Sequence, residues 1–145
     1  MEKRVKFEIA MNPMASPRPR FSSRGGFTKA YMPKEYMAWK AQLLFKWKLL
    51  KLKQEVSGRP LFVKLGFYLE PPIALVKVKK NQAALEAERI PVVKKPDIDN
   101  LQKSVLDALN KHAWPDDNQI SDIYAKKRYS LRPRIEIEVE EVEWL

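Results

Sequence analysis

At 145 residues the chain has the length of one domain with its own hydrophobic core, and it contains no cysteine and a single histidine, His112. Disulfides, cysteine–zinc sites, thiol nucleophiles and histidine-rich metal centres are therefore excluded, which leaves oxygen ligands and a hard ion such as Mg²⁺ or Mn²⁺ for any metal site. The net charge is +10, no apolar run approaches the length of a membrane span, and the N-terminal segment has no apolar signal region, so we expect a cytoplasmic protein without a membrane partner.

The first predicted element is a strand, because Val5, Phe7 and Ile9 alternate with polar residues. We expect the next segment, SPRPRFSSRGGFTKAY over 16–31, to be irregular, because its prolines and the Gly25-Gly26 pair disfavour helix and strand. Its basic residues alternate with aromatic ones. This is typical of a loop that contacts phosphates and stacks on unpaired bases, but it also fits a mobile loop whose aromatic side chains fold back onto the core. The candidates for DNA contact are Arg18, Arg20, Phe21, Arg24, Phe27 and Lys29.

A long amphipathic helix is predicted to begin after Pro33 and to run to the Ser57-Gly58 pair. Large apolar residues recur along it at helical spacing, and we expect this stripe to belong to the core: Tyr36, Trp39, Leu43, Trp47 and Leu50. Lysines occupy much of the remaining surface, which fits either a DNA-facing or a solvated face.

Residues 61–69, LFVKLGFYL, are predicted to form a buried strand that ends at Pro71-Pro72. In the connection over 73–96, KKNQAALEAER fits a short helix and IPVVKKP fits an extended segment. From the sequence this connection can be a lid or an arm.

A second helix is predicted over 98–110, with Asp97 or Asp99 at its N-cap. Its expected buried face consists of Ile98, Leu101, Val105 and Ala108/Leu109. After the turn WPDDNQ, residues 119–129 are predicted to be a strand, whose Lys126, Lys127 and Arg128 are further candidates for DNA contact.

The C-terminal segment RIEIEVEEVEW is a second alternating strand, separated from the preceding one by Arg132-Pro133. The order of elements is therefore β-α-β-α-β-β. This predicts an α/β (α+β) fold over residues 1–145, a single domain with a small mixed sheet flanked by helices.

Charge is unevenly distributed along the chain. Residues 1–80 carry 18 Lys/Arg against five Glu, whereas the window 97–122 carries two Lys against six Asp. A basic field of this size attracts phosphate backbones, and it favours a nucleic-acid-binding protein over a basic protein with no such role.

All aspartates of the chain lie in that window: Asp97, Asp99, Asp107, Asp116, Asp117 and Asp122. At the loop-to-helix junction that Pro96 creates, the carboxylates of Asp97 and Asp99 can converge, and Asp116-Asp117 returns from the next turn. Two or three carboxylates around one Mg²⁺ leave positions for water and a phosphate oxygen. Lys103, one turn beyond Asp99, can orient the water or neutralise charge in the transition state.

Structural roles remain open for several of these residues. Asp107 has lysines at i−4 and i+4 and fits a surface helix pair, one of Asp97 and Asp99 fits a simple N-cap, and Asp116 fits the turn after Pro115. His112 fits a structural or solvent-exposed position better than a catalytic one.

The stretch KPDIDNLQKSVLDALN, followed by WPDDNQISD and a basic strand, resembles the RusA family of Holliday junction resolvases. The family's D-x-D-N-L-x-K helix start, D-A-L and D-D-x-Q turn match Asp97, Asp99, Asn100, Leu101, Lys103, Asp107-Ala108-Leu109, Asp116, Asp117 and Gln119. The match is specific over 95–122 and weaker over the rest. The connection 70–96 is longer than in compact members.

The resemblance implies a Mg²⁺-dependent homodimeric endonuclease, with no small-molecule cofactor, that cuts four-way DNA junctions by paired nicks in recombination and repair. It implies metal ligation by Asp97, Asp99 and Asp117, with Asp116 and Asp122 in support, and an essential role for Lys103. The rivals are a non-catalytic DNA-binding protein that keeps the fold, a less selective branched-DNA nuclease, and a restriction-like nuclease. No Asp/Glu-x-Lys triplet follows Pro96-Asp97, which argues against the restriction-like nuclease.

Overall fold

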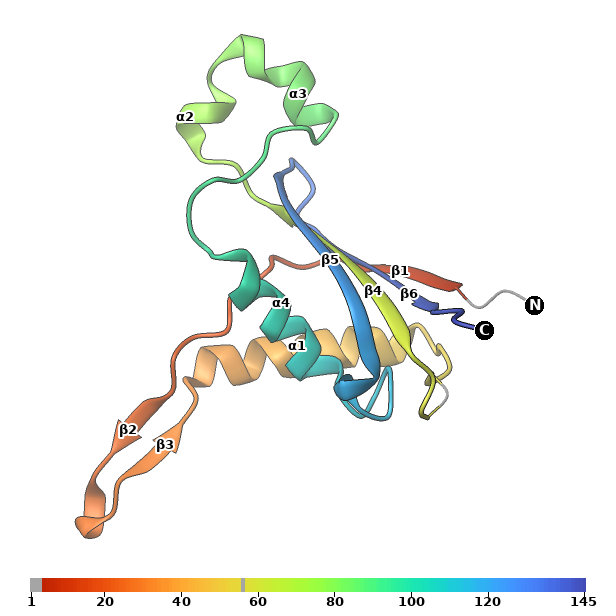
Figure 1. The fold of residues 1–145 in the computed structure, drawn as a ribbon. Helices are drawn as coiled ribbons and strands as arrows, with labels where there is room; N and C mark the ends of the chain where they lie inside the picture. The colour runs from red at the N-terminus through yellow and green to blue at the C-terminus, as the bar shows by residue number, and fades with distance from the viewer. Residues whose placement is uncertain (1–3, 56) are drawn as a thin grey trace.

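The computed structural model describes residues 4–55 and 57–145, without the side chain of Arg24. Its centre is a four-stranded sheet (Figure 1), which consists, in spatial order, of β1 (Arg4–Ile9), β6 (Arg134–Glu141), β4 (Leu61–Leu69) and β5 (Ile120–Tyr129). β4 and β5 are parallel, whereas the other neighbours are antiparallel. The prediction of a small mixed sheet is therefore confirmed.

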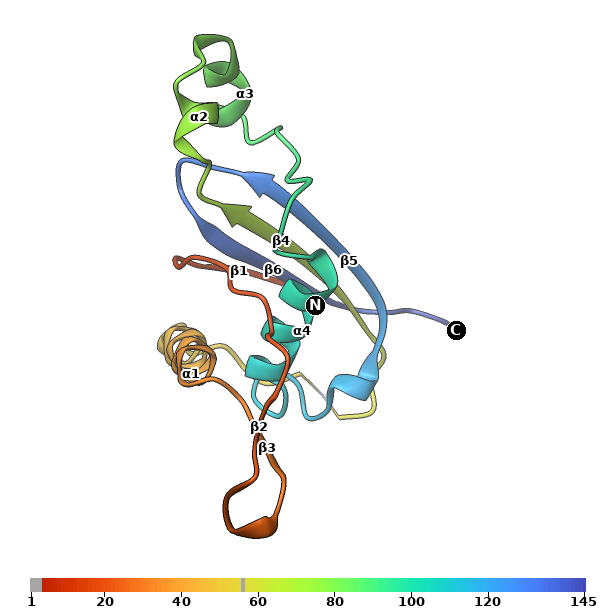
Figure 2. The ribbon, with the colours of Figure 1, turned by 90° about the vertical axis from the view of Figure 1, so that its left-hand side faces the viewer.

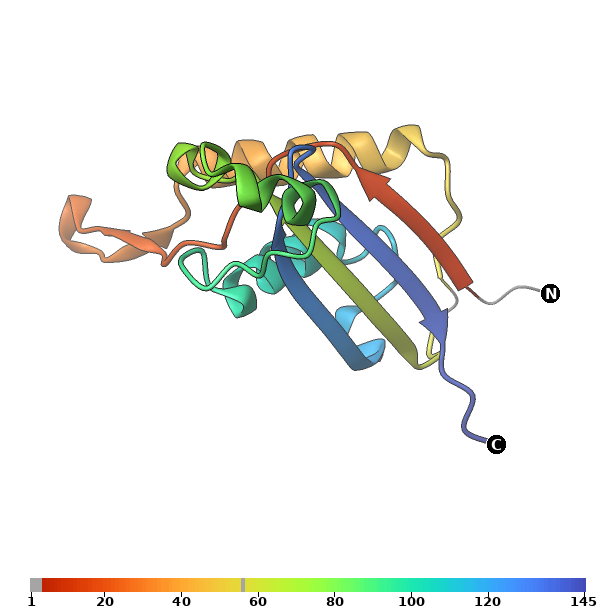
Figure 3. The same cartoon turned by 90° about the horizontal axis from the view of Figure 1, so that it is seen from above.

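The two long helices, α1 (Lys34–Leu49) and α4 (Ile98–Leu109), pack on the same face of this sheet (Figures 2 and 3). Strand alternation explains this, because Val63, Leu65 and Phe67 of β4 are fully buried in the core beneath the helices. The residues between them face the opposite, open side of the sheet. The predicted order of the long elements is thus confirmed, with both helices on one face.

α1 is shorter than predicted. Its apolar stripe belongs to the core as expected, with Tyr36, Trp39, Leu43 and Trp47 buried. The helix ends at Leu49 instead of continuing to Ser57-Gly58, and Lys51 adopts the positive φ of 53° that begins a turn. Leu50, expected in the buried stripe, is 43% exposed because it lies beyond the last helical turn.

Residues 20–31 form a protruding hairpin, so the prediction of irregular structure over 16–31 was wrong there, whereas residues 16–19 are irregular as predicted. β2 (Arg20–Ser22) pairs with β3 (Lys29–Tyr31) antiparallel, and the 3-10 turn η1 (Arg24–Gly26) joins them. Gly25 and Gly26 have φ of 70° and 78°, so they supply the turn of a hairpin and do not exclude strands.

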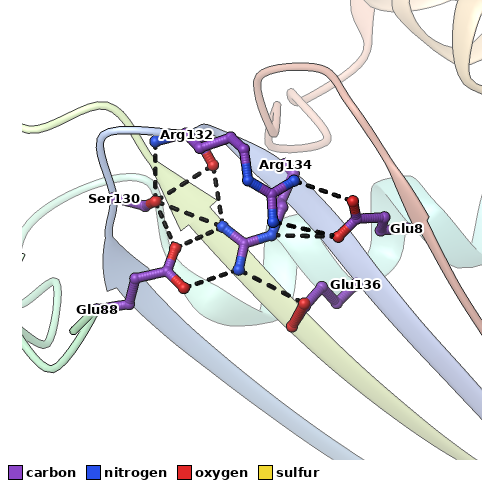
Figure 4. Close-up of polar contacts among 6 residues, drawn as sticks. All are labelled: Glu8, Glu88, Ser130, Arg132, Arg134 and Glu136. Carbon is purple, nitrogen blue, oxygen red and sulfur yellow. Dashed lines mark hydrogen bonds and ion pairs between the residues drawn. The ribbon is translucent and has the colours of Figure 1, made fainter. Parts of the chain in front are cut away.

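The connection between β4 and α4 is an arm that projects beyond the end of the sheet (Figure 1). It contains α2 (Ile73–Val76), the 3-10 turn η2 (Lys79–Asn81) and α3 (Gln82–Glu86). Glu88 ties it to the sheet by bonding to Ser130 and to Arg134, the first residue of β6 (Figure 4). Among the described residues, no helix is long and apolar enough to cross a membrane.

Candidate active site

Two of the predicted metal ligands lie at the N-terminus of α4. Asp97 is the N-cap residue, with extended backbone, and Asp99 is in the first turn; both are exposed. The Asp97 side chain makes no capping hydrogen bond, whereas Asp99 Oδ1 accepts one from the Asn100 N–H at 3.0 Å. The capping alternative for Asp97 is therefore not realised, and its carboxylate points to solvent where an ion or phosphate can reach it. Ile98, expected in the buried face, is 37% exposed beside it.

The hairpin and the arm are both tied to this helix end. The Ser16 N–H at the base of the hairpin donates to the Asn100 carbonyl at 2.9 Å. The Lys127 ammonium donates to the carbonyl of Pro96, the residue before Asp97, at 2.8 Å. Figure 2 shows the result: α4 lies between the arm at one end of the molecule and the hairpin at the other.

Asp116 and Asp117 lie at the other end of α4. The 3-10 turn η3 (Asp117–Gln119) begins after Asp116, whose side chain accepts from the Asn118 N–H in a capping box with Gln119. The Asp117 N–H donates to Asn110 Oδ1 at 2.9 Å. Asn110 ends α4. Sequence reasoning gave it no role, although it is the last residue of the stretch KPDIDNLQKSVLDALN.

Negative charge is concentrated at this end of α4. Burial raises the pKa of Asp117, the neighbouring carboxylates of Asp116 and Asp107 raise it further, and only Lys111 acts in the opposite direction. A bound cation would relieve this repulsion. The predicted surface pairs of Asp107 with lysines are absent from the salt bridges of the described residues. Asp107 lies instead near the Tyr36 hydroxyl. The pKa of Tyr36 is raised by burial and, to a smaller extent, by Asp107.

A single chain does not bring the predicted ligands together. α4 has 12 residues, so Asp97 and Asp99 lie a helix length, about 18 Å, from the turn that carries Asp117. In agreement, the described residues contain no group of three Asp, Glu, His or Cys side chains that could hold a metal ion. Lys103 is exposed on α4 between the two ends.

β5 separates the other candidates by strand alternation. Asp122 pairs with Phe62 and, like Lys126 and Arg128, lies on the open face of the sheet, away from α4. The Lys126 ammonium lies 5.8 Å from the Tyr68 ring centroid. Lys127 points to the helix side. The three basic residues therefore do not form one surface, and Asp122 lies on the opposite face of the sheet from α4.

The model of the family described as endodeoxyribonuclease RusA matches residues 10–140 of this chain. The chain belongs to the RusA family. It is also similar to a Bacillus subtilis (strain 168) protein described as "Uncharacterized protein YqaN", with 30% identity over 138 residues, which cover 95% of this chain and 96% of that protein.

RusA-family membership makes this chain a relative of DNA endonucleases and confirms the family resemblance of the motif. The family match covers the hairpin, the arm and both ends of α4. The D-x-D-N-L-x-K half of the motif lies at the N-terminal end of α4, and the D-D-x-Q half lies beyond its C-terminal end.

Proposed function

We propose that this RusA-family protein is a homodimeric, divalent-metal-dependent endonuclease that resolves four-way DNA junctions by paired symmetric nicks in DNA recombination and repair. The observation that carries the proposal is the family match over residues 10–140 together with the presence of Asp97, Asp99, Asp117 and Lys103. The two-fold symmetry of a four-way junction suits a dimer with two equivalent sites.

The position of the carboxylates supports a metal site that two subunits share. Asp97 and Asp99 lie at one end of α4 and Asp117 beyond the other. A two-fold axis across the middle of α4 would place each end of the helix beside the opposite end of its partner. Asp97 and Asp99 of one subunit and Asp117 of the other, with Asp116 nearby, would then complete an oxygen-ligand set that suits Mg²⁺, for which Mn²⁺ can substitute.

A bound divalent ion would supply Lewis-acid chemistry, lowering the pKa of water and stabilising charge on the phosphodiester. The carboxylates of this chain hold and orient that ion. Lys103 lies on the exposed side of α4, four residues from Asp99 and four from Asp107, so its ammonium can neutralise charge that develops on the phosphate in the transition state.

The hairpin supports the binding of branched DNA. Arg18, Arg20 and Lys29 are exposed on it, and Phe21 and Phe27 are 68% and 80% exposed, so the aromatic rings do not fold back onto the core. We assign phosphate contacts to the basic residues and stacking on unpaired bases near the crossover to the two rings. Arg24 stands at the tip of the hairpin, and its side chain lies outside the described part of the structure.

The test is Mg²⁺-dependent cleavage of a synthetic four-way junction, compared with a linear duplex and a three-way branch of the same sequence. Junction-selective paired nicking supports the proposal. Equal cutting of the substrates points to a less selective nuclease, and binding without cutting to a non-catalytic DNA-binding protein. Asp97→Asn should abolish cleavage and leave junction binding intact or stronger, because it removes a ligand and one negative charge near the phosphate.

Mixed dimers test the sharing of the site. Asp97→Asn and Asp117→Asn are each expected to be inactive alone. In a mixed dimer of the two variants, shared sites leave one site with both native aspartates, so one nick per junction should reappear. If each site were contained in a single subunit, both sites of the mixed dimer would carry one substitution and the mixed dimer would be inactive. An inactive mixed dimer would therefore refute the shared arrangement.

A further inference from the structure

The Lys127 ammonium forms hydrogen bonds within the protein, although the sequence suggested a contact with DNA. It lies on β5 and points to the helix side of the sheet, where its ammonium donates to the carbonyls of Lys94 at 2.9 Å and of Pro96 at 2.8 Å. A lysine has three donors, so two of the three are engaged with the backbone of one short segment. That segment is the last part of the arm, directly before Asp97.

The main chain of β5 holds the preceding residues of the same segment. The Tyr129 N–H donates to the Ile90 carbonyl at 3.0 Å, and the Val92 N–H donates to the Lys127 carbonyl at 3.3 Å. Val92 is also buried, which fixes the segment against the protein. Beyond Val92, up to Asp97, the described part of the chain makes no further backbone bond to β5, and Val93 is almost fully exposed. The Lys127 side chain therefore continues the attachment from Val92 to the start of α4.

We propose that Lys127 is a positioning residue for the metal-binding end of α4. By holding the carbonyls on both sides of Lys95, it fixes the backbone through which the chain enters α4, and so fixes the direction of the Asp97 and Asp99 carboxylates. The inference rests on the proposed function, because it concerns the site where Asp97 and Asp99 would bind the ion. Residues that orient metal ligands in this way typically change metal affinity by about 10- to 100-fold when they are lost.

The neighbouring lysine provides a matched control. Lys126 carries the same charge one residue earlier, but it lies on the open face of the sheet, with its ammonium over the Tyr68 ring. Lys126→Met and Lys127→Met remove the same net charge from adjacent positions of one strand. A difference between them therefore reports the hydrogen bonds to the arm, not the electrostatic field of the protein.

The experiment measures Mn²⁺ binding to the dimeric full-length protein without DNA, by electron paramagnetic resonance, together with hydrogen exchange. Lys127→Met is expected to weaken Mn²⁺ binding by about tenfold. It should also speed exchange of the Leu101 amide, which donates to the Asp97 carbonyl at 3.1 Å. Lys126→Met should match wild type in both, because the Lys126 ammonium lies over the Tyr68 ring on the open face and does not contact this segment. Lys127→Arg, which keeps charge and donors, should recover much of the affinity and serves as the test if the Met variant does not fold.

Equal Mn²⁺ affinity for Lys127→Met and Lys126→Met would overturn the inference. So would a Lys127→Met variant that binds Mn²⁺ normally but binds junctions more weakly with a smaller salt dependence, since that result identifies a phosphate contact. A wild-type protein that binds no Mn²⁺ and cuts no junction is a separate failure, because it overturns the proposed function itself.

Discussion

Replacing Glu88 by Gln should destabilise the protein in a pH-dependent way. Glu88 attaches the arm to the sheet through an ion pair, since its carboxylate bonds to Arg134 and also to Ser130 (Figure 4). The Arg134 side chain is only 5% exposed, and its guanidinium also stacks 3.9 Å from the Tyr68 ring centroid. Glutamine keeps the shape and one acceptor oxygen, but its NH2 group cannot accept from Arg134 or Ser130, so the substitution removes the charge of Glu88 and one of its two acceptor atoms.

The hydrogen bond from Arg134 is the largest cause of the lowered pKa of Glu88, about 2 in the folded protein. Against an ordinary value of 4.5, this shift is equivalent to about 3 kcal/mol of stability at neutral pH. The value is a ceiling, because the Glu88 side chain is 27% exposed and Arg134 keeps Glu8 and Glu136 as partners. We expect a loss of about 2 kcal/mol, in the range for a hydrogen bond to a charged group.

A lowered carboxylate pKa stabilises the folded state above the unfolded pKa, and this contribution disappears as the pH falls from about 4.5 to about 2. Urea unfolding of wild type and Glu88→Gln should therefore differ most near pH 7, and more than half of the difference should be gone by pH 3. Glu86→Gln is the matched control, since Glu86 is exposed on the same arm and, among the described residues, its side chain bonds to Gln82 alone. A difference that is independent of pH, or no larger than that of Glu86→Gln, would refute the reasoning.

Three further predictions concern function. The double variant Phe21→Ala/Phe27→Ala should lose about tenfold or more in junction binding, since stacking is worth roughly 1–3 kcal/mol per base, and its melting temperature should not change; wild-type binding and cutting would contradict the stacking role. Lys103→Ala should lose cleavage in a single-turnover assay and keep junction binding in a gel-shift assay, and normal turnover would reduce it to a surface lysine. Asn110→Ala should lower the free energy of unfolding in urea by about 1 kcal/mol and slow cleavage, because it removes the acceptor of the Asp117 N–H. An unchanged cleavage rate would show that the function of Asp117 does not depend on this hydrogen bond.

The elements with unbroken periodicity could be predicted from the sequence. β4 is at 61–69 as predicted, and α4 and β5 lie within a residue of their predicted bounds. Their alternating or helical patterns extend over several residues and are set by one buried face. The hairpin could not be recognised because its strands have three residues each and bury almost nothing, so no apolar pattern marks them.

The geometry of the site could be predicted only in part. The motif correctly indicated which carboxylates lie at ends of secondary structure. Their closeness in sequence suggested that they surround one metal ion within a single chain. Helix α4, between Asp99 and Asp117, keeps these two carboxylates apart in one chain. Contacts such as Glu88 with Arg134, 46 residues apart, and Lys127 with Pro96, 31 residues apart, depend on how β5 and β6 pack beside the arm. That packing could not be predicted from the composition or from the spacing of residues in the sequence.

The distribution of charge argues that DNA approaches from the helix side. On the open face of the sheet, Lys6 and Lys64 both have Glu138 opposite them in the strand register, and the buried Arg134 is surrounded by glutamates. Cations interleaved with carboxylates produce little field beyond a Debye length, about 10 Å at moderate salt. The exposed arginines of the hairpin have no such acidic neighbours among the salt bridges of the described residues. In the proposed function, phosphates would therefore be drawn to the side of the molecule on which Asp97, Asp99 and Lys103 are exposed. The net charge of the chain would then bring DNA to a locally acidic site that would otherwise repel it.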